Sequence, residues 1–309
     1  MTVTRRPTGA PWWPLLLVEG VDAAPVLAEC LRLSADPWVG TMWVVEVGPS
    51  RADRLGELGP FEVVEHDGTA AGVATAVREL CDVAPAGGRP NVIVLDGSGL
   101  WDLVKKGAEQ LARQSTDAQL RLKRDPFAAV EVLPQHWDWA KSEWWWGPIN
   151  ELHAWPGVGL ILADSYVEDV WEGGHPVPAS AYWTDIEKGT PHAVDATVRV
   201  GSGGRLTVTA TKSLRFRAPA VLPDDEPLVR LIFDLFAAPP EVVLDKRRAQ
   251  RAVLARARAL GMGEEIAQQA ARTAWDREAG IATTFDADDM ARLFAALDDI
   301  DPLDHQEAA

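Results

Sequence analysis

Short, almost continuously apolar segments alternate with helical patterns through the first two-thirds of this 309-residue sequence. Strands are predicted at residues 15–18, 42–47, 61–65, 92–95 and 158–162, and helices at 25–33, 70–83, 100–114 and 137–155. Such alternation is typical of βαβ units, which build a largely parallel sheet. The first, fourth and fifth strand segments contain hardly any polar residue, as expected for strands that are covered on both faces. The sequence therefore predicts a doubly wound α/β domain with these three strands at its centre.

The pattern changes after residue 193. Segments 196–200 and 205–211 alternate apolar and polar residues around a glycine-rich turn, which predicts an antiparallel hairpin at the edge of the sheet. Pro239 and Pro240 then interrupt the chain, and we place a domain boundary there. The expected organisation is an N-terminal arm over residues 1–11, an α/β domain over 12–237 and a helical tail over 241–309.

The tail has the periodicity of three helices. One face of each predicted helix is apolar, and the residues on these faces are Ala249, Val253, Ala257 and Leu260, then Ile266, Ala270, Ala274 and Trp275, then Met290, Leu293, Phe294 and Leu297. Gly261 and Gly280 suit the ends of the first two helices.

The net charge of the chain limits which class of partner it can bind. Acidic residues outnumber basic ones by 46 to 30, giving a formal net charge of −16, which argues against a large nonspecific nucleic-acid surface because such binding depends on neutralising phosphates. A local basic patch remains at the start of the tail, where Arg247, Arg248 and Arg251 are the candidate nucleic-acid contacts. The alternative is a solvated helix face, neutralised by the acidic end of the same tail or of a neighbouring subunit.

The sequence contains no pattern typical of a disulfide framework, a metal site or a membrane span. Cys30 and Cys81 fit neither a disulfide framework nor a metal clasp, so we expect two buried thiols in a reducing compartment. The six histidines show no zinc-site spacing, and we expect no metal. No run reaches the roughly 18 apolar residues that cross a bilayer. A cytoplasmic protein without a membrane partner is expected.

Tryptophan occurs 14 times, against seven phenylalanines and two tyrosines, and six tryptophans are concentrated in residues 137–155. Exposed rings of this kind could stack on the bases of single-stranded nucleic acid. The same segment is acidic, however, so we favour core packing, with a protein-binding patch as the second interpretation and base stacking as the third.

Three stretches together resemble one protein family. They are LSADPWVG (33–40) with LGPFEVVEHDGT (58–69), PNVIVLD (90–96) with LWDL (100–103), and the region from WPG (155–157) to VDATVRV (194–200). In this combination, over about residues 12–237, the chain resembles the RecA-like P-loop ATPases of actinobacterial phages, which belong to the AAA or RecA type and act in DNA recombination. The resemblance implies a RecA-like P-loop NTPase fold with a mostly parallel central sheet. The sequence patterns described above add an antiparallel edge hairpin and a C-terminal helical tail to this expected fold.

The phosphate-binding motif of that family is degenerate in this chain. The motif G-x-x-x-x-G-K-S/T holds phosphates with backbone N–H groups and a lysine, and its hydroxyl binds Mg²⁺. The corresponding segment here is GVDAAPVL (20–27), and none of the seven lysines of the chain follows a glycine. Pro25 lacks an N–H group and Asp22 would repel an anion. We therefore expect no ATP hydrolysis and no catalytic residue.

Other parts of the family's site are also altered. Where relatives have a glutamate after the second strand this chain reads GPS (48–50), and where they have a basic residue after a late central strand it reads ADS (163–165). The resemblance leaves Gly20, Asp96 and Lys188 as the remnant nucleotide site, with Asp96 at the place of a Walker B aspartate. Asp96 could equally cap the next helix, and Lys188 could be an ordinary surface lysine.

Asp22 indicates how the fold could survive without phosphate. In P-loop proteins a bound phosphate satisfies the N–H groups at the start of the first helix. Asp22 precedes the expected helix, and Pro25 suits a first helical turn, so the chain could supply its own anion.

The expected function is that of a catalytically degenerate RecA-like ATPase-family protein, a binding or scaffolding subunit in phage or prophage DNA metabolism. A protein partner or homo-oligomer is expected, and no cofactor. One alternative is an active DNA recombination or repair ATPase that binds ATP and Mg²⁺ through a non-standard phosphate site. The other is a virion or defence-related module for protein–protein interaction.

Overall fold

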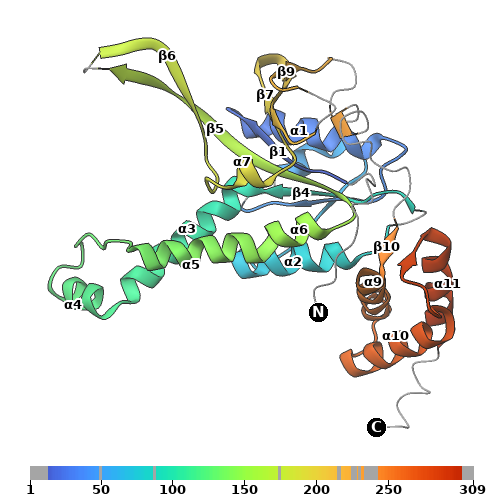
Figure 1. The fold of residues 1–309 in the computed structure, drawn as a ribbon. Coiled ribbons are helices and arrows are strands. Elements are labelled where there is room, and N and C mark those ends of the chain that lie inside the picture. The colour runs from blue at the N-terminus through green and yellow to red at the C-terminus, as the bar shows by residue number, and fades with distance from the viewer. Residues whose placement is uncertain are drawn as a thin grey trace, which may run out of the picture.

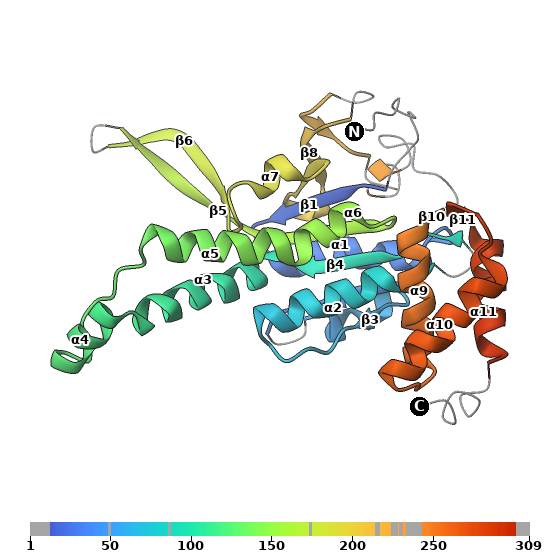
Figure 2. The ribbon, with the colours of Figure 1, turned by 60° about the horizontal axis from the view of Figure 1, so that its bottom comes forward.

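The structure, a computed structural model, describes residues 13–48, 51–85, 88–172, 175–213, 217–223, 228, 231–232 and 243–300. A twisted central sheet carries helices on both faces, and a body of three helices lies at one end (Figures 1 and 2). The expected N-terminal segment over residues 1–11 and the boundary at Pro239 and Pro240 lie outside the described residues.

Nine strands form the sheet in the described part of the chain. They are β1 (Leu15–Gly20), β2 (Met42–Val45), β3 (Glu62–Val63), β4 (Val92–Asp96), β5 (Val158–Glu172), β6 (His175–Thr184), β7 (Ala196–Val200), β8 (Leu206–Thr211) and β9 (Ala220–Val221). The order is β3-β2-β4-β5-β1-β7-β8-β9, with β6 on β5. Pairing is parallel from β3 to β7 and antiparallel from β7 to β9. The predicted parallel α/β sheet, its central strands β4, β5 and β1, and its edge hairpin are thus confirmed.

Helices from the strand connections cover the two faces of the sheet. They are α1 (Ala23–Arg32), α2 (Ala70–Asp82), α3 (Gly97–Gln114), α4 (Thr116–Arg124), α5 (Pro134–Trp144), α6 (Asn150–Ala154) and α7 (Thr190–Ala193). Because side chains alternate along a strand, Leu16 and Val18 of β1 pack in the core under α1, whereas Leu15 and Leu17 pack in the core under α2, α3 and α5. This double burial explains the continuous apolar runs.

The single helix predicted over 137–155 is wrong. The helix begins earlier, at Pro134, and is interrupted by a π-helical turn over Trp145–Ile149 before α6 begins. Gly147 leaves the helical region (φ −81°, ψ −119°). The next residue is Pro148, which disfavours helical backbone in the residue before it and has no N–H group to donate, so a break at this point is expected.

Two projections were not predicted. Strand β5 pairs with β1 and β4 through its first residues and continues with β6 as a two-stranded ribbon that leaves the sheet (Figure 1). Helices α3, α4 and α5 form a second projection, which we call the arm, and α4 lies at its end in both ribbon views (Figures 1 and 2).

The three predicted tail helices are confirmed as α9 (Lys246–Ala259), α10 (Glu264–Glu278) and α11 (Ala287–Asp298), joined by the strand pair β10 (Leu244–Asp245) and β11 (Thr284–Phe285). Their apolar faces form a separate core, although Leu260 is 42% exposed. Gly261 and Gly280 end helices with φ of +79° and +52°, backbone that glycine adopts without strain.

The two cysteines are buried, as expected. Burial raises the pKa of Cys81 to about 12 and raises the pKa of Cys30 still further, so both thiols stay protonated at neutral pH. Among the described residues, no helix combines the length and the apolar character needed to span a membrane.

Candidate functional site

The carboxyl ends of the parallel strands meet at one edge of the sheet, where ligands bind in most open α/β folds. Four acidic residues come from the ends of four strands at this edge: Glu19 from β1, Glu46 just after β2, Asp96 from β4 and Asp164 from β5. Two arginines lie among them, Arg51 and Arg199. This edge contains the connection between β1 and α1, which lies within the segment GVDAAPVL (20–27), and it is the candidate site.

The connection between β1 and α1 is only two residues long, because β1 ends at Gly20 and α1 begins at Ala23. A Cβ atom placed on Gly20 would lie 2.6 Å from Cγ2 of Val26, so the helix packs directly against the end of the strand. Val26 and Leu27, the last two residues of the segment GVDAAPVL (20–27), are each 1% exposed in the core. This connection cannot wrap a phosphate group without moving the helix.

Asp22 caps α1. Its Oδ1 accepts a hydrogen bond from the N–H of Ala24 over 3.0 Å, with extended backbone at Asp22 (φ −122°, ψ 120°). Pro25 lies in the first turn, where the absence of an N–H group costs little. The sequence-based interpretation of Asp22 as an internal anion at the start of the helix agrees with this geometry.

Replacing Asp22 with alanine should lower the free energy of unfolding by about 1 kcal/mol, because an N–H group at the helix start loses its acceptor. Urea unfolding followed by far-UV circular dichroism measures the change. Asp22→Asn is the matched control: its side chain keeps an acceptor oxygen, and it should stay within a few tenths of a kcal/mol of the native protein. An unchanged stability of Asp22→Ala would contradict the capping role.

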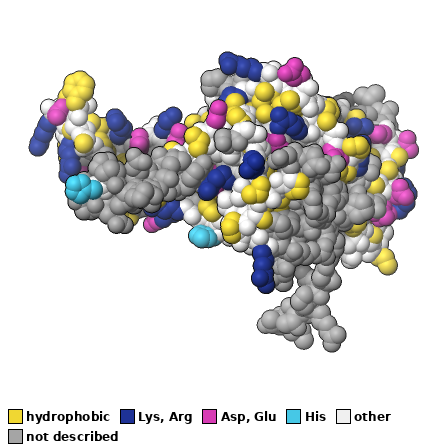
Figure 3. All heavy atoms as spheres, turned by 90° about the horizontal axis from the view of Figure 1, so that it is seen from above, with side chains coloured by type: hydrophobic (Ala, Val, Ile, Leu, Met, Phe, Trp, Pro, Cys, Tyr) yellow, Lys and Arg dark blue, Asp and Glu magenta, His cyan; other side chains and the backbone are white. Residues whose placement is uncertain are grey.

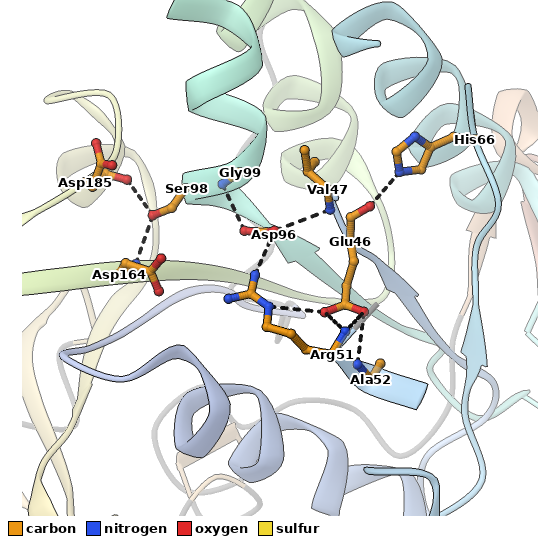
Figure 4. Close-up of polar contacts among 10 residues, drawn as sticks. All are labelled: Glu46, Val47, Arg51, Ala52, His66, Asp96, Ser98, Gly99, Asp164 and Asp185. Atoms are coloured by element: carbon orange, nitrogen blue, oxygen red, sulfur yellow. Dashed lines mark hydrogen bonds and ion pairs between the residues drawn. The ribbon is translucent and has the colours of Figure 1, made fainter. Parts of the chain in front are cut away.

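Arg51 joins two buried carboxylates at the centre of the site (Figure 4). Its Nη2 donates to Oδ2 of Asp96 over 2.9 Å, and its Nε lies 3.5 Å from Oε1 of Glu46. The Glu46 and Asp96 side chains are 4% and 5% exposed, whereas that of Arg51 is 37% exposed. The guanidinium therefore supplies positive charge between two acids that water barely reaches.

Asp96 is held by backbone as well as by Arg51. Its Oδ1 accepts from the N–H of Gly99 over 2.9 Å, which caps α3, and its Oδ2 accepts from the N–H of Val47 over 3.3 Å. Burial raises the pKa of Asp96, and the bond from Gly99 and the charge of Arg51 oppose that rise. The capping alternative considered for this residue is thus realised, while its nucleotide role stays a prediction.

Glu46 is a site residue that the sequence reasoning missed. The second strand was predicted to reach Val47, but β2 ends at Val45, so Glu46 is the acid at its carboxyl end. Both carboxylate oxygens accept from the N–H of Arg51, and Oε2 also accepts from the N–H of Ala52 over 3.0 Å. The available signal was a carboxylate at the end of an apolar run, two residues before the GPS segment begins.

His66 adds a contact to the same loop (Figure 4). Its Nδ1 accepts from the N–H of Gly68 over 3.1 Å, which places the proton on Nε2, and Nε2 donates to the carbonyl of Glu46 over 2.6 Å. The backbone that carries Glu46 is therefore fixed from both sides.

Asp164 stands at the end of the sheet-forming part of β5. Its backbone N–H donates to Oγ of Ser98 over 2.9 Å, and that hydroxyl donates to the carbonyl of Asp185 over 2.6 Å. Partial burial raises the pKa of the Asp164 side chain, against the influence of Arg51.

A cavity of about 10 Å³ lies between α1 and β5, with room for roughly one water molecule. Its lining residues are Val26, Arg51, Asp96, Leu162, Ala163 and Asp164. Pockets for nucleotide-sized ligands usually measure about 300 Å³ or more. In this conformation the candidate site therefore holds no nucleotide-sized space at this point.

A second ion pair, between Glu19 and Arg199, lies at the neighbouring part of the edge. Arg199 of β7 donates from Nε and Nη2 to Oε1 of Glu19 over 2.9 and 2.7 Å, and Oγ1 of Thr184 donates to Oε2 over 2.6 Å. Since β1 and β7 are paired in register at these two residues, the contact follows from the parallel sheet. At this edge, Arg51 and Arg199 thus provide the buried carboxylates with ion-pair partners from within the chain.

The other predicted contact residues are dispersed. Lys188 is exposed in the turn before α7, and no contact joins it to Gly20 or Asp96 within the described residues. Arg248 is 8% exposed and donates to the carbonyl of Cys81, and Nε of Arg251 lies 2.8 Å from Oδ1 of Asp82. These two arginines hold α9 against α2, and of the three only Arg247 is exposed.

Most tryptophans of residues 137–155 pack in the core, which is the interpretation that we favour from the sequence. Trp144 and Trp155 are 0% and 5% exposed, and Trp137 and Trp145 are half-buried against the same core. Trp146, by contrast, is 76% exposed.

Within the described ranges no cluster of three or more His, Cys, Asp and Glu side chains is arranged to hold a metal ion. Comparison with known proteins gave no relationship: no protein-family model matches the chain, and no curated protein matches it.

Proposed function

We propose that this protein is a non-hydrolysing relative of RecA-like P-loop ATPases that acts as a binding or scaffolding subunit in phage or prophage DNA metabolism. The single observation that carries the proposal is the two-residue connection between β1 and α1, with Val26 and Leu27 in the core. Where the family places phosphate, this chain places packed apolar side chains and a capping carboxylate.

The ion pairs support the same proposal. In phosphoryl-transfer sites a metal ion and basic residues neutralise the phosphates, and acidic residues hold the metal. Here Asp96 is bound by Arg51, and Glu19 is bound by Arg199. The acids are neutralised by the chain itself, so the edge is stable without a ligand.

The order of strands is compatible with the resemblance. Strand β5 lies between β1, which precedes the degenerate segment, and β4, which ends at Asp96. The assignment to DNA metabolism rests on the sequence resemblance alone.

Mg-ATP at millimolar concentration should leave the thermal unfolding midpoint unchanged. A ligand present at 100 times its Kd would add about 2.7 kcal/mol to the free energy of unfolding, a large shift in a melting experiment. Differential scanning calorimetry with Mg-ATP, and with Mg²⁺ and inorganic phosphate as separate controls, makes the measurement. A Mg-dependent rise accompanied by phosphate release would establish the active ATPase and reject this proposal.

Contact with nucleic acid is the less favoured role, because Arg248 and Arg251 are engaged between α9 and α2. Labelled single-stranded DNA, titrated at two salt concentrations, tests it: an affinity that falls steeply with salt would show phosphate contacts. Little binding at either concentration agrees with a protein partner.

A further inference from the structure

The end of the arm carries exposed basic and apolar side chains together. We call residues 113–127 the basic tip: its cations are Arg113, Arg121, Lys123 and Arg124, and its acids are Asp117 and Asp125. Phe127 and Leu120 in the same segment are 95% and 52% exposed. Figure 3 shows basic and hydrophobic side chains side by side at the far end of the arm.

The cations of the basic tip have no internal partners among the described residues. Each of the twelve ion pairs that join described side chains uses other basic groups, including Arg32, Arg51, Lys105 and Arg199. Helix α4 contacts the rest of the fold mainly through α3. A chain with a net charge of −16 thus presents positive charge at the end of a projection.

The segment around α11, at the opposite end of the molecule, is acidic. We call residues 281–300 the acidic pole: its acids are Asp286, Asp288, Asp289, Asp298 and Asp299, and its only cation is Arg292. Asp298 pairs with Arg256 and Asp289 pairs with Arg292, whereas Asp288 and Asp299 are exposed. Ile281, at the start of this segment, is fully exposed.

We propose that the basic tip of one copy of this chain binds the acidic pole of a second copy. The two surfaces are complementary in charge, and each carries an exposed apolar side chain that the contact would cover, Phe127 on the tip and Ile281 on the pole. Complementary charge of this kind determines register and partner choice, and buried apolar area adds affinity.

The positions of the two surfaces determine the type of assembly. Helix α4 and helix α11 lie at opposite ends of the molecule in both ribbon views (Figures 1 and 2). A contact between unlike surfaces at opposite ends is heterologous, so it continues from copy to copy in a chain or closes into a ring. This inference gives the proposed scaffold a partner, a second copy, and it does not depend on the state of the nucleotide site.

Sedimentation velocity over a range of protein concentrations tests the contact. At about 0.1 M salt the Debye length is about 10 Å, so the net charges of two copies are largely screened while contacting pairs still attract. We expect concentration-dependent association at that salt and a large loss of it at about 1 M, where the Debye length is about 3 Å. Monomers at every concentration and at both salts would overturn the proposal.

A charge exchange identifies the surfaces. Arg121→Glu with Arg124→Glu changes the formal charge of the tip from +2 to −2, and Asp288→Lys with Asp298→Lys and Asp299→Lys changes that of the pole from −4 to +2. Each of these two variants alone should associate roughly tenfold more weakly or worse, because like charges then face each other. An equimolar mixture should recover association, since the reversed tip fits the reversed pole and the native tip fits the native pole. Failure of the mixture to recover would exclude this pair of surfaces.

The matched control for the tip variant is Arg54→Glu with Lys106→Glu, which makes the same change in net charge at exposed positions outside the tip and the pole. It should associate like the native chain. Circular dichroism verifies that each variant is folded, and since all the changed side chains are exposed, we expect full folding. Equal weakening by the control would mean that net charge alone governs association and would reject the contact. If the copies do not associate, the prediction for Mg-ATP is unaffected, because it concerns a different part of the molecule.

Discussion

Replacing Trp144 with alanine should lower the free energy of unfolding by about 4 kcal/mol. The ring is 0% exposed, its Nε1 donates to Oγ1 of Thr190 over 3.0 Å, and Trp101 meets it edge-on at a centroid distance of 5.7 Å. Alanine removes the hydrogen bond and the ring contact and leaves a cavity at the base of the arm.

Two variants separate the contributions at Trp144. Phenylalanine fills most of the space but leaves the Thr190 hydroxyl, also 0% exposed, without the indole donor, so we expect a smaller loss of about 2 kcal/mol. Trp146→Ala is the exposed control, with 76% of the residue accessible, and should stay within about 0.5 kcal/mol of the native protein. Urea unfolding followed by circular dichroism measures all three; equal stability of Trp144→Ala and Trp146→Ala would contradict the packing described.

The central strands could be predicted because burial on both faces gives each of them a continuous run of apolar residues. The apolar segment at Leu15–Gly20 has no free face, and the same holds for Val92–Asp96, so the position of each in the sheet follows from one short segment. The tail helices were predictable for a similar reason, since each buries one stripe at helical spacing.

The ribbon of β5 and β6 could not be predicted in the same way. The strand continues from the core segment at residue 162 into a segment with four acidic residues, which ends the apolar run although the backbone stays extended to Glu172. The partner strand, rather than burial, provides the hydrogen bonds there. The break at Gly147 could have been anticipated, because Gly147-Pro148 carries a direct backbone signal.

The site was the least predictable part, because its contacts join distant parts of the chain. Arg51 and Asp96 are 45 residues apart, and Glu19 and Arg199 are 180 residues apart. Such pairs depend on strand order and register, which local periodicity does not contain. An error of two residues at the end of β2 was enough to hide Glu46, since a strand end decides which side chain reaches the edge.

Removal of the Arg51 side chain should lower the free energy of unfolding by about 2–3 kcal/mol, because it leaves two buried carboxylates without their shared cation. The expected loss is below the largest values for buried pairs because the arginine itself is 37% exposed. Arg51→Ala is compared with the double variant Arg51→Ala/Asp96→Asn, in which the amide still accepts from Gly99 but carries no charge. We expect the double variant to recover about 1 kcal/mol or more of the loss.

The loss of unfolding free energy in Arg51→Ala should be larger at neutral pH than at acidic pH. Burial already raises the pKa of Asp96, and Arg51 opposes that rise, so the variant without Arg51 should have a still higher pKa at this carboxyl. A carboxyl whose pKa is higher in the folded state favours folding when protonated, and this contribution disappears as the pH rises through the folded-state value. The difference in unfolding free energy between the native protein and Arg51→Ala should therefore be largest at neutral pH and shrink towards acidic pH. A difference that does not change with pH would show that Arg51 stabilises the edge by packing rather than by neutralising Glu46 and Asp96.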